Sequence, residues 1–467
     1  MAGTISDVFA RVVPQRTAQR HVVLYVALQI DDMTALPSRH RLDGVELVSF
    51  GRGERSAIRR DIDGKPGLVI GIPDPVMSSD HGRLIQTDGA WHLEDPRSKN
   101  GAVVDGQRTR ATRVEPGAIM QLGHTILLFE HARLGDGAAL DVLATPLAPP
   151  RAELVTLDAG LAAVVADFER IAAMDVPILL LGETGTGKEI FARALHALSR
   201  RTGKLVAVNC GAIPSTLIES ELFGHKKGAF SGASSDRPGH LRAADRGTLF
   251  LDEIGELSPT AQTALLRSLQ SREVVPVGES LPVAVDFRVI SATHRDLSAM
   301  IEEDRFREDL YGRLLGITVA LPPLRERRFD LGILIGTLLR RIDPQGRARI
   351  TPPAARSLFA YAWPRNIREL ERVLIGSLAR SADGVITVDH LPEEIAACDI
   401  PHGRASATVP AGVPSDPEDD ALRAEIIAAL VRHGGNVTAA AKQLGRHREQ
   451  LHRWARRLGI NLDSFRR

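Results

Sequence analysis

The 467-residue sequence lacks the features that mark several large classes of protein. Its only cysteines, Cys210 and Cys398, are too few for a disulfide framework or a zinc site built on several thiolates, so a reducing cytoplasm suits it best. No apolar run approaches the roughly 20 residues of a membrane span, and the first residues lack the apolar core of a signal peptide. Neither sign of charge dominates, because 59 basic and 58 acidic residues give a formal net charge of +1. That balance gives no hint of a nucleic-acid partner, although a total can hide a segregated patch.

The pattern of strands, helices and turns predicts a multidomain chain, in line with about three domains at roughly 150 residues each. Residues 22–131 carry short strand-like runs between Gly, Pro, Asp and Asn turns, which predicts an all-β sandwich. Residues 132–152 are rich in Ala, Gly and Pro and are expected to form a linker. Apolar strands alternate with helices in 153–395, which predicts an α/β domain whose parallel sheet is covered on both faces. A second, Pro-rich linker at 396–420 precedes the helical segment 421–467.

A glycine-rich loop joins an apolar strand to a helix near the start of the α/β domain. Its residues are Gly182, Glu183, Thr184, Gly185, Thr186, Gly187, Lys188 and Glu189. Glycines let backbone N–H groups curl around phosphate oxygens, and the N-terminus of the helix adds its dipole. Lys188 is expected to reach the β and γ phosphates of a nucleotide. Because Glu189 stands where the strict motif has Ser or Thr, a Mg²⁺ ion must depend more on other ligands.

Two acidic residues end a later apolar strand, Gly247-Thr248-Leu249-Phe250-Leu251-Asp252-Glu253. The carboxyl end of such a strand lies beside the phosphate loop in a parallel sheet. Asp252 is therefore expected to hold Mg²⁺, mainly through its waters, and Glu253 to polarise the attacking water. An apolar run followed by two acids is usually a simple strand end, and only its pairing with the loop gives it this meaning.

The glycine-rich loop, the ELFGHKKGAFSGA run at 221–233 and the GTLFLDEIGEL run at 247–257 resemble the AAA+ domain of sigma-54-dependent transcriptional activators, the bacterial enhancer-binding proteins. The likeness continues in order through 287–297, 306–328 and 363–371, and covers roughly 155–395. It implies an ATPase with an α/β core and a small helical subdomain. It also implies ATP and Mg²⁺ as cofactors and a ring, usually a hexamer, as the active assembly.

The same resemblance implies roles for single residues. Arg307 and Arg313 match arginine fingers, which act across a subunit boundary on the transferring phosphoryl group. Arg368 matches the sensor II residue that contacts nucleotide from the helical subdomain, and His294 lies at the sensor I position. Asn209 matches the switch residue that restrains the catalytic glutamate.

A flexible loop at Gly228, Ala229, Phe230, Ser231, Gly232 and Ala233 is the segment that separates this family from other AAA+ ATPases. An apolar ring on a mobile loop is best explained by a partner surface, although Phe230 could also tuck into the local core. The family pattern GAFTGA engages sigma-54, and here Ser231 replaces the Thr and Lys226 stands where Glu is usual. Sigma-54 RNA polymerase is therefore the expected partner.

The N-terminal region resembles a forkhead-associated (FHA) domain, a β-sandwich that binds phosphothreonine peptides. The resemblance is carried by Phe50–Gly53, Met77–Leu84, Trp91–Asp95 and Ser98–Gly101. It implies that Arg52 and Ser78 contact phosphate, that Asn100 holds the peptide backbone, and that His81 braces the loop. A degenerate sandwich that serves only protein contacts is the alternative. The sequence shows no sign of a receiver domain with a phosphoacceptor aspartate.

The last segment has the pattern of a helix-turn-helix. Residues 434–467 hold eight Lys or Arg and two acids, so the near-neutral total conceals a basic end on a mildly acidic body. The segment resembles the Fis-type C-terminal domain of these activators, with its last helix as the recognition helix. The expected DNA contacts are Arg446, His447, Arg448, Gln450 and Arg453, and an upstream, enhancer-like DNA site is the expected partner.

The whole pattern predicts a regulator that binds DNA, hydrolyses ATP and remodels sigma-54 polymerase under control of a phosphorylated protein. Two alternatives stay open: a DNA-binding repressor or scaffold with vestigial ATPase activity, and an AAA+ ATPase of remodelling or replication. The intact Lys188, Asp252 and Glu253 argue against the first, and the loop around Phe230 argues against the second.

Overall fold

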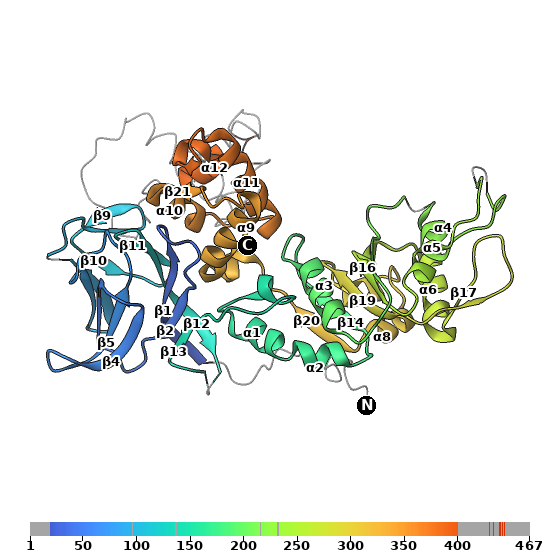
Figure 1. Cartoon of the computed structure of the whole chain (residues 1–467), viewed down its shortest axis with the longest axis horizontal. Coiled ribbons are helices and arrows are strands. Elements are labelled where there is room, and N and C mark those ends of the chain that lie inside the picture. Colours follow the sequence, from blue (N-terminus) through green and yellow to red (C-terminus); the bar gives the residue numbers. More distant parts are fainter. Residues whose placement is uncertain are drawn as a thin grey trace. The chain divides into compact units, whose positions relative to one another are not determined.

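A computed structural model of the chain describes residues 19–399, apart from residues 96, 136, 137, 215, 231 and 232, together with residues 429, 433, 439, 441 and 443. The chain divides into two compact units, residues 1–401 and 402–467. The first unit contains a β-sandwich in blue and cyan, an α/β domain in green and yellow, and a helical subdomain in orange (Figure 1). Among the described residues, no helix is both long and apolar enough to cross a membrane.

The sandwich packs two sheets face to face, as the short strands and turns predict. One sheet has the order β13-β2-β1-β12-β11-β8-β9, and the other has the order β10-β7-β6-β3-β5-β4. The strands are β1 Gln19–Gln29, β2 Ser38–Arg41, β3 Leu47–Arg52, β4 Ser56–Ile62, β5 Lys65–Ile72, β6 Gly82–Thr87, β7 Ala90–Glu94, β8 Ala102–Val104, β9 Gln107–Thr109, β10 Ala111–Val114, β11 Ala118–Leu122, β12 Thr125–Leu134 and β13 Asp141–Leu143. The core between the sheets includes Phe50 of β3, Trp91 of β7 and Phe129 of β12.

Part of the segment that composition predicts as a linker is structured. β13 pairs antiparallel with β2. The Asp141 carboxylate accepts a hydrogen bond from Arg59 Nε at 2.7 Å and lies 2.8 Å from His40 Nδ1. These partners hold the pKa of Asp141 at about 2, despite the opposing effect of burial. Small residues and prolines alone could not reveal this, because the pairing depends on a distant strand.

The α/β domain is built on a sheet with the order β15-β16-β19-β14-β20, and its strands are parallel, as predicted. Its strands are β14 Ile178–Leu181, β15 Leu205–Asn209, β16 Thr248–Asp252, β19 Arg288–Thr293 and β20 Ile317–Ala320. The helices are α1 Ala159–Ala166, α2 Phe168–Ala173, α3 Lys188–Leu198, α4 Ile218–Phe223, α5 Gly239–Ala243, α6 Pro259–Ser271, α7 Leu297–Glu302 and α8 Glu308–Leu314. β17 (Glu273–Val274) and β18 (Val283–Ala284) form a short hairpin. Two apolar clusters cover the sheet, one containing α6 and the other α3, so its strands read as continuous apolar runs.

A helical subdomain, called the lid here, follows β20. It contains α9 Leu331–Ile342, α10 Pro352–Ala360, α11 Asn366–Arg380 and α12 Glu393–Ala396, with the short 3-10 turns η4 Leu324–Glu326 and η5 Arg328–Asp330 before them. Its small parallel pair joins β21 (Arg349–Ile350) to β22 (Val385–Ile386). Trp363, which is fully buried, donates its indole N–H to the Leu358 carbonyl at 2.9 Å, so the lid closes around a satisfied aromatic side chain.

Candidate functional site

A cavity of about 610 Å³ lies where the glycine-rich loop meets the lid. Its size is within the range usual for small-molecule sites. The lining combines four parts of the chain: the loop and the start of α3, the ends of β15 and β16, the short stretch at 153–155, and lid residues of α9 and α11. The carboxyl ends of the parallel strands therefore form one wall, as a ligand site in an open α/β sheet requires.

The glycine-rich loop adopts a geometry that its glycines make possible. Gly185 and Gly187 have φ of +83° and +104°, in the left-handed region that other residues rarely adopt. A Cβ on Gly185 would lie 2.4 Å from the Arg365 carbonyl oxygen, so the lid backbone also requires a glycine there. Lys188 lies across the loop and donates from Nζ to the carbonyl oxygens of Gly182 (2.7 Å) and Glu183 (3.1 Å). Burial lowers the pKa of this ammonium, while the nearby acids Glu253 and Asp252 oppose that effect.

Three lid side chains hold the loop from outside. The Glu183 carboxylate forms a two-point ion pair with Arg325 at 2.8 and 2.5 Å and accepts a bond from Asn366 Nδ2 at 3.0 Å. These donors hold the pKa of Glu183 at about 2. Arg327, which is 5% exposed, donates to the Thr186 carbonyl at 2.9 Å. Glu183 is thus a bridge between the loop and the lid, not only a loop residue.

The two acids at the end of β16 lie on the cavity wall, and a histidine contacts one of them. His294 Nδ1 lies 2.6 Å from Glu253 Oε2. Glu253 has φ of +54°, an unusual conformation for a non-glycine residue and one that often marks functional positions. Asn209, which also lines the cavity, instead accepts bonds at Oδ1 from the N–H groups of Gly211 and Ala212. In this conformation the Glu253 carboxylate therefore contacts His294, whereas the resemblance assigns the restraint of that group to Asn209.

Asp252 is the carboxylate best suited to a divalent cation. Burial and the neighbouring Glu253 raise its pKa, whereas Lys188 works in the opposite direction. Among the described residues, no group of three or more His, Cys, Asp or Glu side chains could enclose a metal ion. Mg²⁺ binds typically through one or two carboxylates together with waters and substrate phosphates. The residues fit such a shared site, because a bound cation would offset the repulsion between the neighbouring carboxylates of Asp252 and Glu253.

The arginines predicted to contact nucleotide lie in two different places. Arg368 of α11 lines the cavity, where its charge adds to the lowering of the Lys188 pKa by burial and partly opposes the rise in the Asp252 pKa. Arg307, the residue before α8, and Arg313 of α8 are both exposed and lie outside this lining. Arg307 forms a two-point ion pair with Asp309 at 2.9 and 2.7 Å. The structure therefore brings Arg368 to the nucleotide cavity of its own chain and leaves the other two on the surface.

The loop at 228–233 is closed by its own backbone. The N–H of Gly228 donates to the Ala233 carbonyl at 2.9 Å, and that of Ala233 donates to the Phe230 carbonyl at 3.0 Å. The Phe230 ring is 37% exposed and meets the edge of the His225 ring, with the two centroids 5.0 Å apart. Ser231 and Gly232 lie outside the described residues. Phe230 is thus neither fully exposed nor part of the apolar core, and its ring is supported from one side.

The predicted phosphopeptide residues come together at one end of the sandwich. The Arg52 N–H donates to the Ser78 carbonyl at 2.9 Å, and Asn100 Nδ2 donates to the Val76 carbonyl at 3.0 Å. His81, which is 1% exposed, accepts at Nδ1 from the Ser78 N–H, so its Nε2–H is left to donate to the Gly101 carbonyl at 3.2 Å. This histidine joins the two loops that carry Ser78 and Asn100, as its predicted bracing role requires.

The five predicted DNA-contacting residues, Arg446, His447, Arg448, Gln450 and Arg453, lie outside the described residues. Within the first unit, sequence reasoning missed Arg325, Arg327 and Asn366, which hold the glycine-rich loop. All three fall in the PPLRERR and WPRNIRE runs, which carry the family resemblance. Their polar side chains next to prolines could have marked them as candidates. Their partners could not be predicted, because they are more than 100 residues away in the sequence.

Family models match the chain in four consecutive places. They are the FHA domain at 48–123, the Sigma-54 interaction domain at 154–320, the AAA+ ATPase lid domain at 325–407 and the Bacterial regulatory protein, Fis family, at 423–454. The last match confirms the predicted helix-turn-helix class for the tail, and the first three confirm the fold class of the described domains.

Curated relatives agree with these matches. The chain is 44% identical over 291 residues to the transcriptional regulatory protein ZraR of Escherichia coli (strain K12), covering 62% of this chain and 64% of ZraR. It is 46% identical over 454 residues to the acetoin catabolism regulatory protein of Cupriavidus necator, covering 90% of this chain and 67% of that protein. A solved structure of NtrX from Brucella abortus in complex with ATP is 33% identical, with a TM-score of 0.47, and the match covers 66% of this chain and 69% of NtrX. The chain thus spans a little under two thirds of the length of ZraR. It belongs to the family of sigma-54-dependent transcriptional activators, with an FHA domain ahead of its AAA+ and Fis-type domains.

Proposed function

We propose that this chain is an ATP-hydrolysing activator that binds upstream DNA and remodels sigma-54 RNA polymerase so that the promoter opens. The observation that carries the proposal is the cavity, which gathers Lys188, Asp252, Glu253 and Arg368 around a space of nucleotide size. A chain with vestigial ATPase activity would have no need to keep these groups together.

Different residues of the cavity would bind the phosphates, the base and the Mg²⁺ ion of the nucleotide. The backbone N–H groups of 182–189 and Lys188 would hold the phosphates, and the apolar residues Leu154, Leu161 and Leu338 offer a surface for the base. Asp252 would hold Mg²⁺, which when bound neutralises charge on the phosphate oxygens. Lys188 would leave the loop carbonyls that it now contacts and turn to the β and γ phosphates.

The acid–base chemistry falls to Glu253. Its carboxylate would orient and polarise the attacking water, and His294 would hold that carboxylate in place through the 2.6 Å contact. Asn209, at the end of the neighbouring strand β15, would provide an alternative partner when the nucleotide state changes.

Arginine fingers complete the site from the next subunit. Arg307, just before α8, and Arg313 on α8 are exposed and do not line their own cavity, which suits a role across a subunit boundary. That role requires a closed ring, which we propose is a hexamer in the active state. Arg307 would then exchange its surface partner Asp309 for the transferring phosphoryl group.

The remaining partners follow from the other surfaces. The 228–233 loop would contact sigma-54 through Phe230, with Ser231 keeping the hydroxyl of the usual Thr. The tail would bind DNA through Arg446, His447, Arg448, Gln450 and Arg453. The FHA domain would bind a phosphothreonine-containing protein through Arg52, Ser78 and Asn100. We propose that the protein acts in the cytoplasm, where these partners would be found.

The proposal is tested with the full chain, ADP with aluminium fluoride as a mimic of the transition state, and purified sigma-54. Wild-type protein should retain sigma-54 in a pull-down, and Phe230→Ala should lose it while hydrolysing ATP at the wild-type rate. Ile375→Ala removes a similarly exposed apolar side chain, on α11, and should change neither property. Capture of sigma-54 by Phe230→Ala at the wild-type level would contradict the proposed contact.

A further inference from the structure

One sheet of the FHA sandwich is buried on both faces. Along β12, Leu127 and Phe129 face the core between the sheets, whereas Ile126 and Leu128 belong to a second apolar cluster. All four are at most 1% exposed. An antiparallel sheet of a sandwich normally keeps its outer face polar and solvated, so this outer face is covered by another part of the protein.

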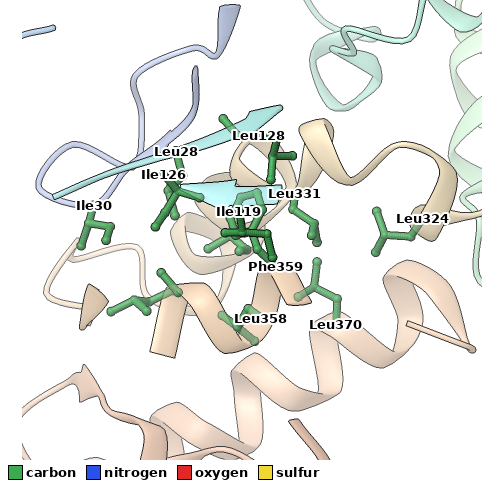
Figure 2. Packing of buried hydrophobic residues seen from close by; sticks show 14 of the residues in the cluster. Leu28, Ile30, Ile119, Ile126, Leu128, Leu324, Leu331, Leu358, Phe359 and Leu370 are labelled. Carbon is green, nitrogen blue, oxygen red and sulfur yellow. The ribbon is translucent and has the colours of Figure 1, made fainter. Parts of the chain in front are cut away.

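The covering element is the lid of the same chain. Figure 2 shows Leu28, Ile119 and Leu128 of the sandwich gathered with Leu331, Phe359 and Leu370 of the lid. α9 contacts β1, and α10 contacts β11. The two domains therefore share one apolar core, whereas a domain joined only by a flexible tether would leave both faces exposed.

Two glycines on α9 permit this close packing. A Cβ at Gly332 would lie 1.9 Å from the Ala27 carbonyl oxygen, and a Cβ at Gly336 would lie 2.1 Å from the Met33 carbonyl oxygen. Both obstacles are backbone atoms, which cannot move aside as a flexible side chain can. Glycine weakens a helix interior, so its presence at positions i and i+4 of α9 is explained by the approach of the sandwich backbone.

Specific contacts surround the apolar core. The Tyr25 ring stacks on Phe329 with the centroids 4.5 Å apart. Arg328 forms an ion pair with Glu130 at 2.5 Å and donates to the Gly117 carbonyl at 3.2 Å. Hydrogen bonds and an aromatic stack fix the orientation of the surfaces, which an apolar patch alone would not.

The docked helix also forms a wall of the nucleotide cavity. Leu334, Thr337, Leu338 and Arg341 of α9 line the cavity, while Gly332 and Gly336 of the same helix meet the sandwich. Because α9 is a rigid helix that contacts the sandwich with one face and lines the cavity with another, a movement at one of these contacts must also affect the other.

Hydrogen bonds within the sandwich connect β12, which contacts the lid, to the loops that we propose bind phosphopeptide. Asp74, which is 3% exposed, accepts bonds from the Val76 N–H at 2.8 Å, the His124 N–H at 2.7 Å and Thr125 Oγ1 at 2.8 Å. Val76 in turn accepts from Asn100, and Thr125 begins β12.

We propose that the FHA domain is docked on the lid of its own chain as a fixed part of the ATPase, so that nucleotide binding and events at the FHA domain are linked through α9. The part of this proposal that concerns phosphopeptides depends on the proposed function of Arg52, Ser78 and Asn100. The docking itself does not, because its evidence is the shared core. By thermodynamic reciprocity, a ligand that shifts the lid must alter binding at the sandwich, and the reverse must also hold.

The docking is tested by cysteine labelling of the full chain in a Cys398→Ser background. Leu128→Cys places a thiol in the shared core, and Leu127→Cys, one residue away, places it in the core between the sheets. We expect maleimide to react slowly with both. Gly332→Ala should accelerate labelling at position 128 by at least about tenfold and leave position 127 slow, since only the docking opens. Gly376→Ala on α11, where a Cβ meets open space, is the matched control and should accelerate neither.

Two further measurements keep the outcome decisive. If Gly332→Ala fails to fold, Glu130→Gln removes the ion pair with Arg328 and should accelerate position 128 in the same selective way. ADP should slow labelling at position 128 but not at position 127. Rapid labelling of Leu128→Cys in the otherwise unaltered chain would overturn the docking, and no effect of bound ADP would overturn the link. Neither readout requires sigma-54, DNA or phosphopeptide, so failure here is distinguishable from failure of the proposed function.

Discussion

Asp330 is the buried charge whose removal should be most visible in the stability of the protein. It lies at the start of α9, is 1% exposed, and accepts bonds from Thr156 Oγ1 at 2.6 Å and from the Leu157 N–H at 2.8 Å. Burial raises the pKa of its carboxyl to about 6, although nearby Arg327 and these two donors work in the opposite direction. We predict that Asp330→Asn abolishes a distinct part of the pH dependence of folding.

The size and sign follow from proton linkage. A shift from 3.8 to about 6 corresponds to about 3 kcal/mol at 1.36 kcal/mol per unit. Because the pKa is raised in the folded state, this contribution to stability is fully present below pH 3.8 and is lost as pH rises through 6. Asn at 330 cannot titrate, so the free energy of unfolding of wild type minus that of Asp330→Asn should fall by about 2 kcal/mol between pH 4 and 7, which is most of the full effect.

The assay is chemical unfolding followed by tryptophan fluorescence, to which Trp363 contributes from the lid core that also contains Leu331. Any offset that does not depend on pH, such as the loss of the Asp330 charge near Arg327, cancels because only the change with pH is compared. Asp343→Asn at the other end of α9 is the control of opposite sign. Backbone N–H donors lower the pKa of Asp343, so its stabilising effect is lost as pH falls. A difference between wild type and Asp330→Asn that is constant from pH 4 to 7 would refute the reasoning.

Three further substitutions test the proposed sites. Lys188→Ala should weaken ATP binding at least about tenfold by calorimetry, since it removes the ammonium on the loop; unchanged affinity would remove Lys188 from the site. His294→Ala should reduce kcat about 10-fold to 100-fold with little change in nucleotide affinity, because it frees the Glu253 carboxylate without touching the loop; equal losses in binding would point to a structural role. Arg52→Ala should abolish phosphate-dependent binding to a phosphothreonine peptide library, and wild-type protein that ignores phosphate would favour a sandwich used only for protein contacts.

Local patterns made much of the site predictable. The glycine-rich loop and the two acids at the end of β16 are each defined within a few residues, and parallel strands bring such ends to one edge of the sheet. The same logic predicted the closeness of Arg52, Ser78 and Asn100 in the sandwich, because the family motifs mark loops at one end. In each of these places, backbone geometry alone determines which residues meet.

Contacts between distant segments were not predictable in the same way. The 2.5 Å ion pair of Glu183 with Arg325 and the 2.6 Å contact of His294 with Glu253 depend on how the lid and neighbouring strands are placed. One feature of the sequence does indicate that this sheet is buried on both faces. Residues 22–30 are apolar almost without alternation, as a strand buried on both faces requires. Composition shows that such a face is covered, but not which helix covers it.

Open-complex formation on a sigma-54 promoter tests the central claim most directly. Full-length wild-type protein, sigma-54 holoenzyme and ATP should melt the promoter, as detected by permanganate footprinting. Glu253→Gln should bind ATP and DNA as wild type does but fail to melt the promoter, because its amide cannot accept a proton from the attacking water. Melting by Glu253→Gln at the wild-type level, or melting by wild type without ATP, would contradict the account.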